Sequence, residues 1–234
     1  MKSEDLKWKN LYKIGGISAL LAAVLLLMEI IVFTIWPQPG TVIDYFTLFQ
    51  SNKLIGLIDF YLLEFIAYIL FVPMFLALYV ALKRCNESYM IIAISLLILG
   101  VGIFLATNNS FSMLSLSNQY MAATTEAQKS ILLAAGQTML TNTGQRAFGG
   151  FNTGFMLISI AGIIVSALML RSKKFGRNTA YLGILAFAIS LAEYVRMIII
   201  PSELTLLLII AILSGVLLMI WLILVGRSLI KISN

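Results

Sequence analysis

Five ionisable residues interrupt segments of the sequence that are otherwise apolar. In the stretch SLAEYVRMIII, for example, Glu193 and Arg196 lie three residues apart. A charged residue at the centre of a membrane helix costs about 2.5–3.5 kcal/mol on insertion scales, so such a residue is expected to face protein or water and to have a partner. The five residues are Glu29, Asp59, Glu64, Glu193 and Arg196.

Four carboxyls and one guanidinium in apolar surroundings leave an excess of negative charge. Three arrangements would offset it: protonation of some carboxyls, a water-filled cavity, or a bound cation. Each arrangement implies a polar pocket. Counted at about 1.5 Å per residue along a helix, all of these charges fall in the outer half of their segments. This common depth predicts one outward-facing acidic pocket rather than several separate charges.

Helical spacing places other polar groups beside the charged ones. Tyr61 and Tyr68 share a helix face with Glu64, and Asn152 lies at the start of a later apolar segment. Glu193 continues a stripe of small residues, which is typical of close helix–helix approach in membranes. The predicted residues of the ligand- or cation-binding pocket are Glu29, Asp59, Tyr61, Glu64, Tyr68, Asn152, Glu193 and Arg196.

Structural interpretations stay open for several members of this set. Asp59 lies near a predicted helix start, where a solvated carboxylate is common. Glu193 and Arg196 fit a buried pair that holds two helices together, and both tyrosines fit ordinary packing. The GFNTG motif at 150–154 is typical of a helix-packing surface.

The pocket predicts a protein that binds a small molecule, a lipid or a cation, and a proton- or cation-coupled transporter is one form of this class. Two other classes stay open: an intramembrane enzyme that uses carboxylates for acid–base chemistry, and a non-catalytic accessory or assembly subunit with structural charges. The sequence has no histidine and one cysteine, which excludes imidazole metal sites, Ser-His-Asp chemistry and an internal disulfide. We expect no catalytic residue, no metal site and no cofactor, and we favour a binding protein over an enzyme.

The elements that carry these residues are predicted to be membrane helices. The chain is 61% hydrophobic and 11% charged, whereas soluble domains are about 25% charged. A spanning helix needs about 20 apolar residues. We therefore predict an all-α polytopic membrane bundle that forms a single domain over residues 1–234. Its six transmembrane helices are expected at about 14–36, 54–82, 89–107, 148–170, 179–200 and 204–226.

The distribution of basic residues predicts the orientation of the bundle. With the N-terminus in the cytoplasm, twelve Lys and Arg residues lie inside and three lie outside, as the positive-inside rule requires. Both termini are therefore expected in the cytoplasm. The basic charge indicates membrane lipids as partners, not nucleic acid. A homo-oligomer is also considered, because a second copy would supply polar groups that the inner halves of the spans lack.

Residues 108–147 are too long for a structureless connection in a compact protein. The sequence TEAQ at 125–128 is typical of a capping box, and good helix formers follow it. We predict a short extracellular helical cap between the third and fourth spans, with a second short helix before the capping box. The alternative is a loop that contains one nascent helix.

Two stretches resemble a known family: LSLSNQYMAATTEAQKSILLAAGQTML, and the later LMLRSKKFGRNTAYLGILA. The chain is similar, over about residues 12–232, to prokaryotic six-span membrane proteins catalogued as domain-of-unknown-function family 4386. The resemblance implies a multi-pass protein of the prokaryotic plasma membrane. It implies no reaction, cofactor or site residue.

Overall fold

The computed structural model describes residues 7–142, 150–199 and 204–234, and within these residues the chain forms ten α-helices. Six of them are long and apolar enough to cross a membrane, which confirms the predicted all-α class and the number of spans. The six are α2 (Lys9–Ile35), α5 (Leu62–Leu82), α6 (Glu87–Thr107), α9 (Gly150–Met169), α10 (Arg177–Ile199) and α11 (Leu204–Ser233).

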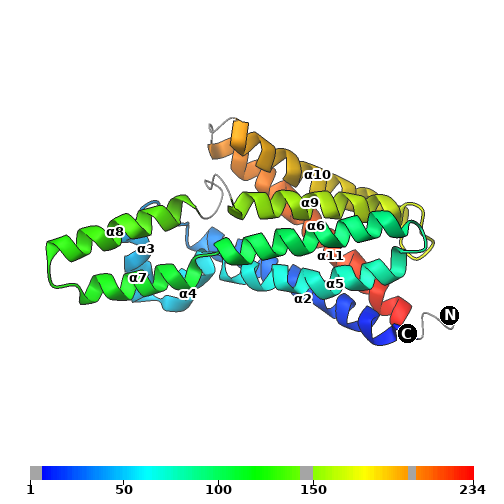
Figure 1. The fold of residues 1–234 in the computed structure, drawn as a ribbon, viewed down its shortest axis with the longest axis horizontal. Coiled ribbons are helices and arrows are strands. Elements are labelled where there is room, and N and C mark those ends of the chain that lie inside the picture. The colour runs from blue at the N-terminus through cyan, green and yellow to red at the C-terminus, as the bar shows by residue number, and fades with distance from the viewer. Residues whose placement is uncertain (1–6, 143–149, 200–203) are drawn as a thin grey trace.

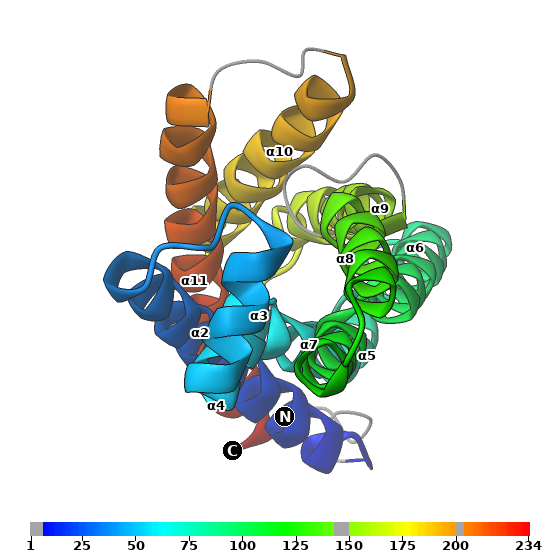
Figure 2. The ribbon, with the colours of Figure 1, turned by 90° about the vertical axis from the view of Figure 1, so that its left-hand side faces the viewer.

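The six long helices form a closed ring. In the order α2, α5, α6, α9, α10, α11, each helix packs against the next, and α11 packs against α2 to close the ring. The start of α2 and the end of α11 lie at one end of this bundle (Figure 1). Figure 2 views the bundle along its long axis, and α10 and α11 diverge toward the end that faces the viewer.

Four shorter helices project from the other end of the bundle. They are α3 (Val42–Ser51), α4 (Lys53–Asp59), α7 (Ser110–Ala122) and α8 (Glu126–Thr141), and we call them together the extension (Figure 1). The extension has a small apolar core of its own, built from Val42, Tyr45, Phe46, Phe49, Phe60 and Met113. Because this core is separate from that of the bundle, the extension is a second packed unit rather than a set of loops.

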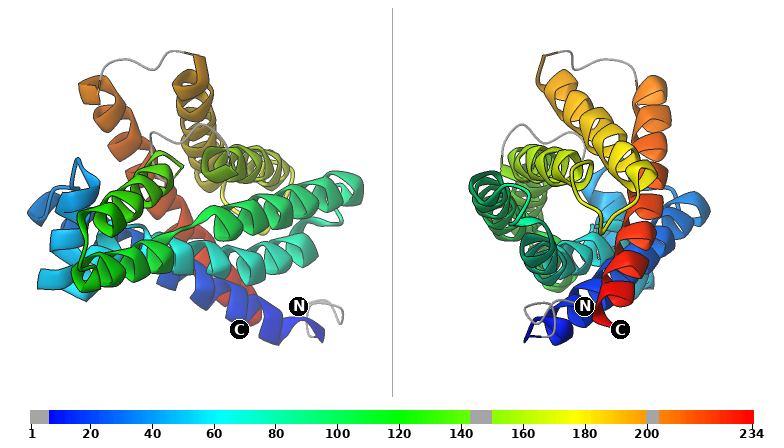
Figure 3. Two further views of the ribbon diagram at one scale, coloured as in Figure 1. Left: turned by 60° about the vertical axis from the view of Figure 1, so that its left-hand side comes forward. Right: turned by 90° about the vertical axis from the view of Figure 1, so that its right-hand side faces the viewer.

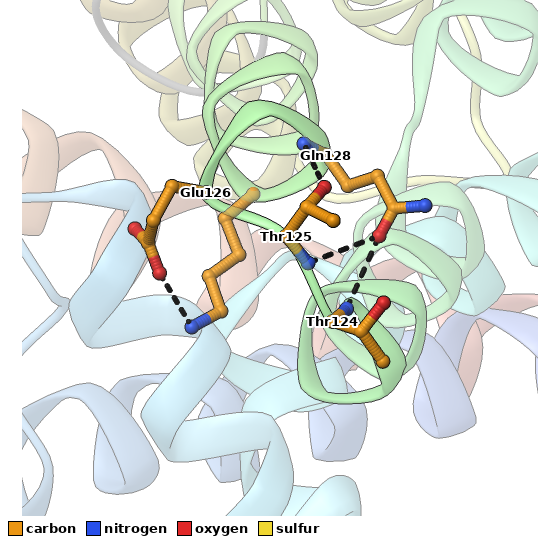
Figure 4. Close-up of polar contacts among 5 residues, drawn as sticks. Thr124, Thr125, Glu126 and Gln128 are labelled. Atoms are coloured by element: carbon orange, nitrogen blue, oxygen red, sulfur yellow. Dashed lines mark hydrogen bonds and ion pairs between the residues drawn. The ribbon is translucent and has the colours of Figure 1, made fainter.

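The predicted capping box is present at the start of α8. The backbone N–H of Gln128 donates to the Thr125 hydroxyl at 3.2 Å, and the Gln128 side chain accepts from the Thr125 N–H at 3.3 Å (Figure 4). An ion pair of 3.0 Å between Lys129 and Glu126 adds to this first turn. The two helices predicted for this segment are therefore observed, whereas the extracellular position of the cap stays a prediction.

The structure differs from the sequence prediction between residues 37 and 61. Residues 42–51, expected in a loop, form α3, whose first turn is capped by the Thr41 side chain accepting from the Asp44 N–H at 3.2 Å. The second long helix begins at Leu62 and not near residue 54. The helix is interrupted because Tyr61 adopts a left-handed backbone conformation with φ 67°, which does not continue a right-handed helix.

Glycines allow two pairs of helices in the ring to approach closely. A Cβ atom on Gly100 of α6 would lie 2.6 Å from the carbonyl oxygen of Gly154 of α9, and the reverse distance is 2.7 Å. A Cβ atom on Gly16 of α2 would lie 2.9 Å from the carbonyl oxygen of Gly226 of α11, and the reverse distance is also 2.9 Å. The glycine motif at 150–154 thus contributes a packing surface through Gly154, as its structural interpretation predicted.

We expect Gly100→Val to destabilise the bundle by about 1–3 kcal/mol, the usual cost of inserting atoms into a packed interface. A valine side chain at this position meets the backbone of α9, which cannot move aside as a flexible side chain would. Gly102 is the matched control, because it lies on the same helix and a Cβ there meets no atom within 4 Å. Thermal unfolding in detergent measures both variants, and equal melting temperatures would contradict the packing assignment.

Candidate functional site

A cavity of about 340 Å³ lies inside the ring at the end that carries the extension. Its walls come from α2, α5, α9, α10 and α11, together with Tyr61, which immediately precedes α5. The helices α2 and α10 contribute residues near their C-terminal ends, and α5, α9 and α11 contribute residues near their N-terminal ends. The residues that line the cavity are Leu26, Glu29, Ile30, Phe33, Thr34, Tyr61, Glu64, Tyr68, Asn152, Phe155, Ser190, Glu193, Tyr194, Ile212, Ser214, Gly215 and Leu218.

Three glutamates from three different helices face this cavity. Glu29 of α2 and Glu193 of α10 are 5% and 4% exposed, and Glu64 of α5 is half-buried. Each has one side-chain oxygen that is buried and has no hydrogen-bond partner in the described part of the chain. Buried polar atoms are paired in the great majority of cases, so three such oxygens in one cavity form an unusual group.

Arg196 offsets only one of these carboxyls. Its Nη2 atom lies 3.4 Å from the second carboxyl oxygen of Glu193, and both residues belong to α10. Arg196 does not line the cavity, and none of the described lining residues is basic. Glu29 and Glu64 are close enough to interact electrostatically with each other. When both are ionised, no basic residue of the described cavity wall offsets their charge.

Aromatic rings cover a large part of the same wall. Phe155 of α9 stacks on Tyr194 of α10 with ring centroids 5.3 Å apart, and it contacts Tyr68 of α5 at 4.9 Å. On the other side, Phe33 of α2 meets Tyr61 edge to face at 6.0 Å. Carboxylates and aromatic faces both attract positive charge, so the two kinds of side chain favour the same ligands.

The segment 59–61, which we call the junction, connects the extension to the cavity. Each of its three carbonyl oxygens accepts a hydrogen bond from a distant side chain. Gln38 donates to the carbonyl of Asp59 at 3.0 Å, the Ser110 hydroxyl lies within bonding distance of the carbonyl of Phe60, and Asn108 donates to the carbonyl of Tyr61 at 3.3 Å.

Asn108 also accepts from the backbone N–H of Ser110 at 3.1 Å, and its Oδ1 atom is 2.6 Å from the Ser110 hydroxyl. These bonds fix Tyr61 in a backbone conformation that few residues other than glycine adopt, and Tyr61 in turn lines the cavity.

Six of the eight residues predicted from the sequence line the cavity: Glu29, Tyr61, Glu64, Tyr68, Asn152 and Glu193. Arg196 contributes indirectly, through Glu193. Asp59 does not line the cavity and lies in the junction. It is fully buried, and burial raises the pKa of its carboxyl to about 6. The role of these residues in ligand binding stays a prediction.

Several lining residues were not predicted. Phe33, Phe155 and Tyr194 have no feature in the sequence that distinguishes them from other aromatic residues of the spans. Gly215 also lines the cavity, and a Cβ atom there would meet no atom within 4 Å. Ser190 of α10 also lines the cavity, and it belongs to the stripe of small residues that Glu193 continues, which is the sequence signal that indicated this wall.

The chain matches a known protein family. The family described as "Domain of unknown function (DUF4386)" matches residues 11–226, and this range includes every helix described above except the last turns of α11 and the first residues of α2. No curated protein and no solved structure matches the chain.

Proposed function

Given that the chain belongs to the DUF4386 family, whose description states no activity, we propose from the chemistry of the cavity that it is a membrane protein that binds a small organic cation. The ligand occupies the cavity between α2, α5, α9, α10 and α11. Its positive charge lies among Glu29, Glu64 and Glu193, and its apolar groups contact the aromatic rings.

The observation that carries this proposal is the pair of carboxyls of Glu29 and Glu64. Both face the cavity, and each has a buried oxygen without a hydrogen-bond partner. An ionised carboxylate that is removed from water and left without a partner costs several kcal/mol. A cation between the two helices would supply the missing partner for both.

The other lining residues favour an organic cation over a metal ion. The described residues contain no group of three His, Cys, Asp or Glu residues arranged to hold a metal. The rings of Phe155, Tyr68 and Tyr194 supply faces that attract ammonium groups. The cavity volume is also in the range of small-molecule sites, about 300–1,000 Å³. A quaternary or protonated amine with an apolar substituent satisfies all three features.

We further propose that the cavity lies in the outer half of a prokaryotic plasma membrane. The support is the distribution of Lys and Arg, with twelve residues on the side of the termini and three on the other, which favours cytoplasmic termini. In that orientation the extension is the extracellular cap. The lining residues are confined to one end of the bundle, so they support binding more directly than passage across the membrane.

Isothermal titration calorimetry with benzyltrimethylammonium tests the proposal on protein in lipid nanodiscs. The parent protein is expected to bind this cation and not its uncharged isostere, neopentylbenzene. In Gly215→Leu the new side chain occupies the cavity, and we expect at least about a tenfold loss of affinity, equivalent to about 1.4 kcal/mol. Gly102→Leu makes the same substitution on an exposed helix face and is expected to bind like the parent. Equal binding of the isostere, or an unchanged Gly215→Leu, would contradict the proposal.

A further inference from the structure

The cavity opens on the side of the bundle between α2 and α11. Two of its lining residues, Thr34 of α2 and Ile212 of α11, are exposed, and Ile212 is 56% exposed. Residues deeper in the same cavity, such as Glu29 and Leu218, are buried. The exposed members therefore mark an opening, and both belong to the two helices that close the ring.

The two helices diverge toward this opening. At the end near the chain termini, Gly16 and Gly226 bring their backbones into contact. Eleven residues before Gly226 on α11, Gly215 meets no atom within 4 Å in the direction of its missing side chain. The divergence of α2 and α11 is visible in Figure 1 and in both views of Figure 3. The opening lies where the two helices are apart and where Gly215 has no side chain.

The surface around the opening is apolar. Leu27 and Ile31 of α2 and Leu213 and Val216 of α11 are all exposed, and each belongs to a helix that is long and apolar enough to span a membrane. In a bilayer such residues face acyl chains. A ligand at the opening is therefore in contact with hydrocarbon, while the interior of the cavity presents carboxyls.

We infer that the ligand is a single-chain cationic amphiphile that enters from the bilayer through the opening between α2 and α11. This inference rests on the proposed function and adds the class of ligand and its route. The ammonium head lies beside Glu29 and Glu64, and the alkyl chain passes between Thr34 and Ile212 into the surrounding lipid. The chain remains in an apolar environment throughout, so binding does not transfer it into water.

The charge of the cavity argues against a phospholipid in this position. A phospholipid head carries a phosphate, and none of the described lining residues is basic. A phosphate placed near Glu29 and Glu64 would meet like charges in a setting of low dielectric, where repulsion is strong. A head group with positive charge alone fits the cavity, and an alkylamine or alkyltrimethylammonium compound has that chemistry.

Photolabelling tests the inference with a dodecyltrimethylammonium probe that carries a diazirine at the far end of its chain. Protein in nanodiscs is irradiated with the probe, and labelled peptides are mapped by mass spectrometry. Specific labelling is defined as the part that excess benzyltrimethylammonium removes. We expect this part on residues 26–35 and 212–220, which flank the opening, and we expect it to fall about tenfold or more in the double variant Glu29→Gln/Glu64→Gln.

A matched pair of variants tests the route. Ile212→Trp narrows the opening and is expected to lower specific labelling at least about threefold, while benzyltrimethylammonium, which has no long chain, still binds. Ile223→Trp is the control, because Ile223 is an exposed isoleucine of α11 three turns away that does not line the cavity.

The outcomes separate this inference from the proposed function. If specific labelling maps to the extension instead, or if Ile212→Trp and Ile223→Trp behave alike, entry from the bilayer is overturned while cation binding stands. If benzyltrimethylammonium binds by calorimetry but removes none of the labelling, the amphiphile is overturned as the ligand class. If benzyltrimethylammonium itself does not bind to the parent protein, the proposed function fails.

Discussion

The double variant Glu29→Gln/Glu64→Gln is expected to bind benzyltrimethylammonium about 100-fold more weakly than the parent protein, or not measurably. A hydrogen bond or contact that involves a charged group contributes about 1.5–3 kcal/mol, and the two carboxyls are the only acids of the described cavity wall that lack a basic neighbour. Glutamine keeps the size and shape of each side chain. Calorimetry in nanodiscs measures the loss.

The same double variant is expected to be more stable than the parent when no ligand is present. Each substitution removes the cost of holding a carboxylate with a buried, unpaired oxygen, and neutral amides are less costly to bury than charges. Weaker binding together with a higher melting temperature would show that the two carboxyls serve the ligand and do not hold the empty protein together. A lower melting temperature would therefore contradict the proposal.

Two controls complete this test. Glu193→Gln is expected to have a smaller effect on affinity than either of the other glutamates, because Arg196 already offsets its charge. Glu126→Gln removes an exposed carboxylate of the extension that pairs with Lys129, and it is expected to leave affinity unchanged. If all four glutamates contribute equally, the effect comes from the net charge of the protein and not from the cavity.

The second large effect is expected from Asn108→Leu, which removes a side chain that bonds to the junction. The substitution removes the Asn108 donor from the carbonyl of Tyr61, which keeps a 3.0 Å bond from the N–H of Phe65, and it leaves the N–H of Ser110 without its side-chain acceptor. A polar group left unpaired in a buried position costs about 1–3 kcal/mol, so we expect destabilisation of about 1–3 kcal/mol. Thermal or denaturant unfolding in detergent measures it.

Asn108→Leu is also expected to weaken cation binding. The bond from Asn108 helps to hold Tyr61 in its left-handed conformation, and this conformation places Tyr61 in the cavity wall. Asn118→Leu is the matched control: Asn118 lies exposed on α7, where it accepts only a 3.3 Å bond from Gln50. If both asparagine variants unfold at the temperature of the parent, the junction does not hold the extension on the bundle.

The residues of the cavity that could be predicted from the sequence are those with a high cost of burial. Glu29, Glu64 and Glu193 stood out because carboxyls in apolar helices need a shared polar environment, and that requirement is independent of the details of the fold. Aromatic residues carry no such cost. Phe33 and Phe155 pack equally well in any part of a membrane bundle, so their position in the cavity became visible only with the structure.

The placement of Asp59 shows where counting along the sequence fails. Its predicted depth assumed a straight helix from residue 54 to residue 82, but the chain turns at Tyr61. Residues in the left-handed conformation are usually glycine or asparagine, so a tyrosine in the sequence does not predict this conformation. The helix α3, in contrast, had a detectable signal, because Thr41 and Asp44 have the spacing of a helix N-cap and a first-turn acid.

The contact between Gly16 and Gly226 has a consequence for biogenesis. It joins α2 to α11, which is synthesised after the other described helices, so the wall formed by Ile212, Ser214, Gly215 and Leu218 is absent until α11 has been made. Until α11 has left the translocon, Glu29 has no complete chamber around it and faces whatever the insertion machinery provides. The cavity can therefore assemble only after α11 has been inserted.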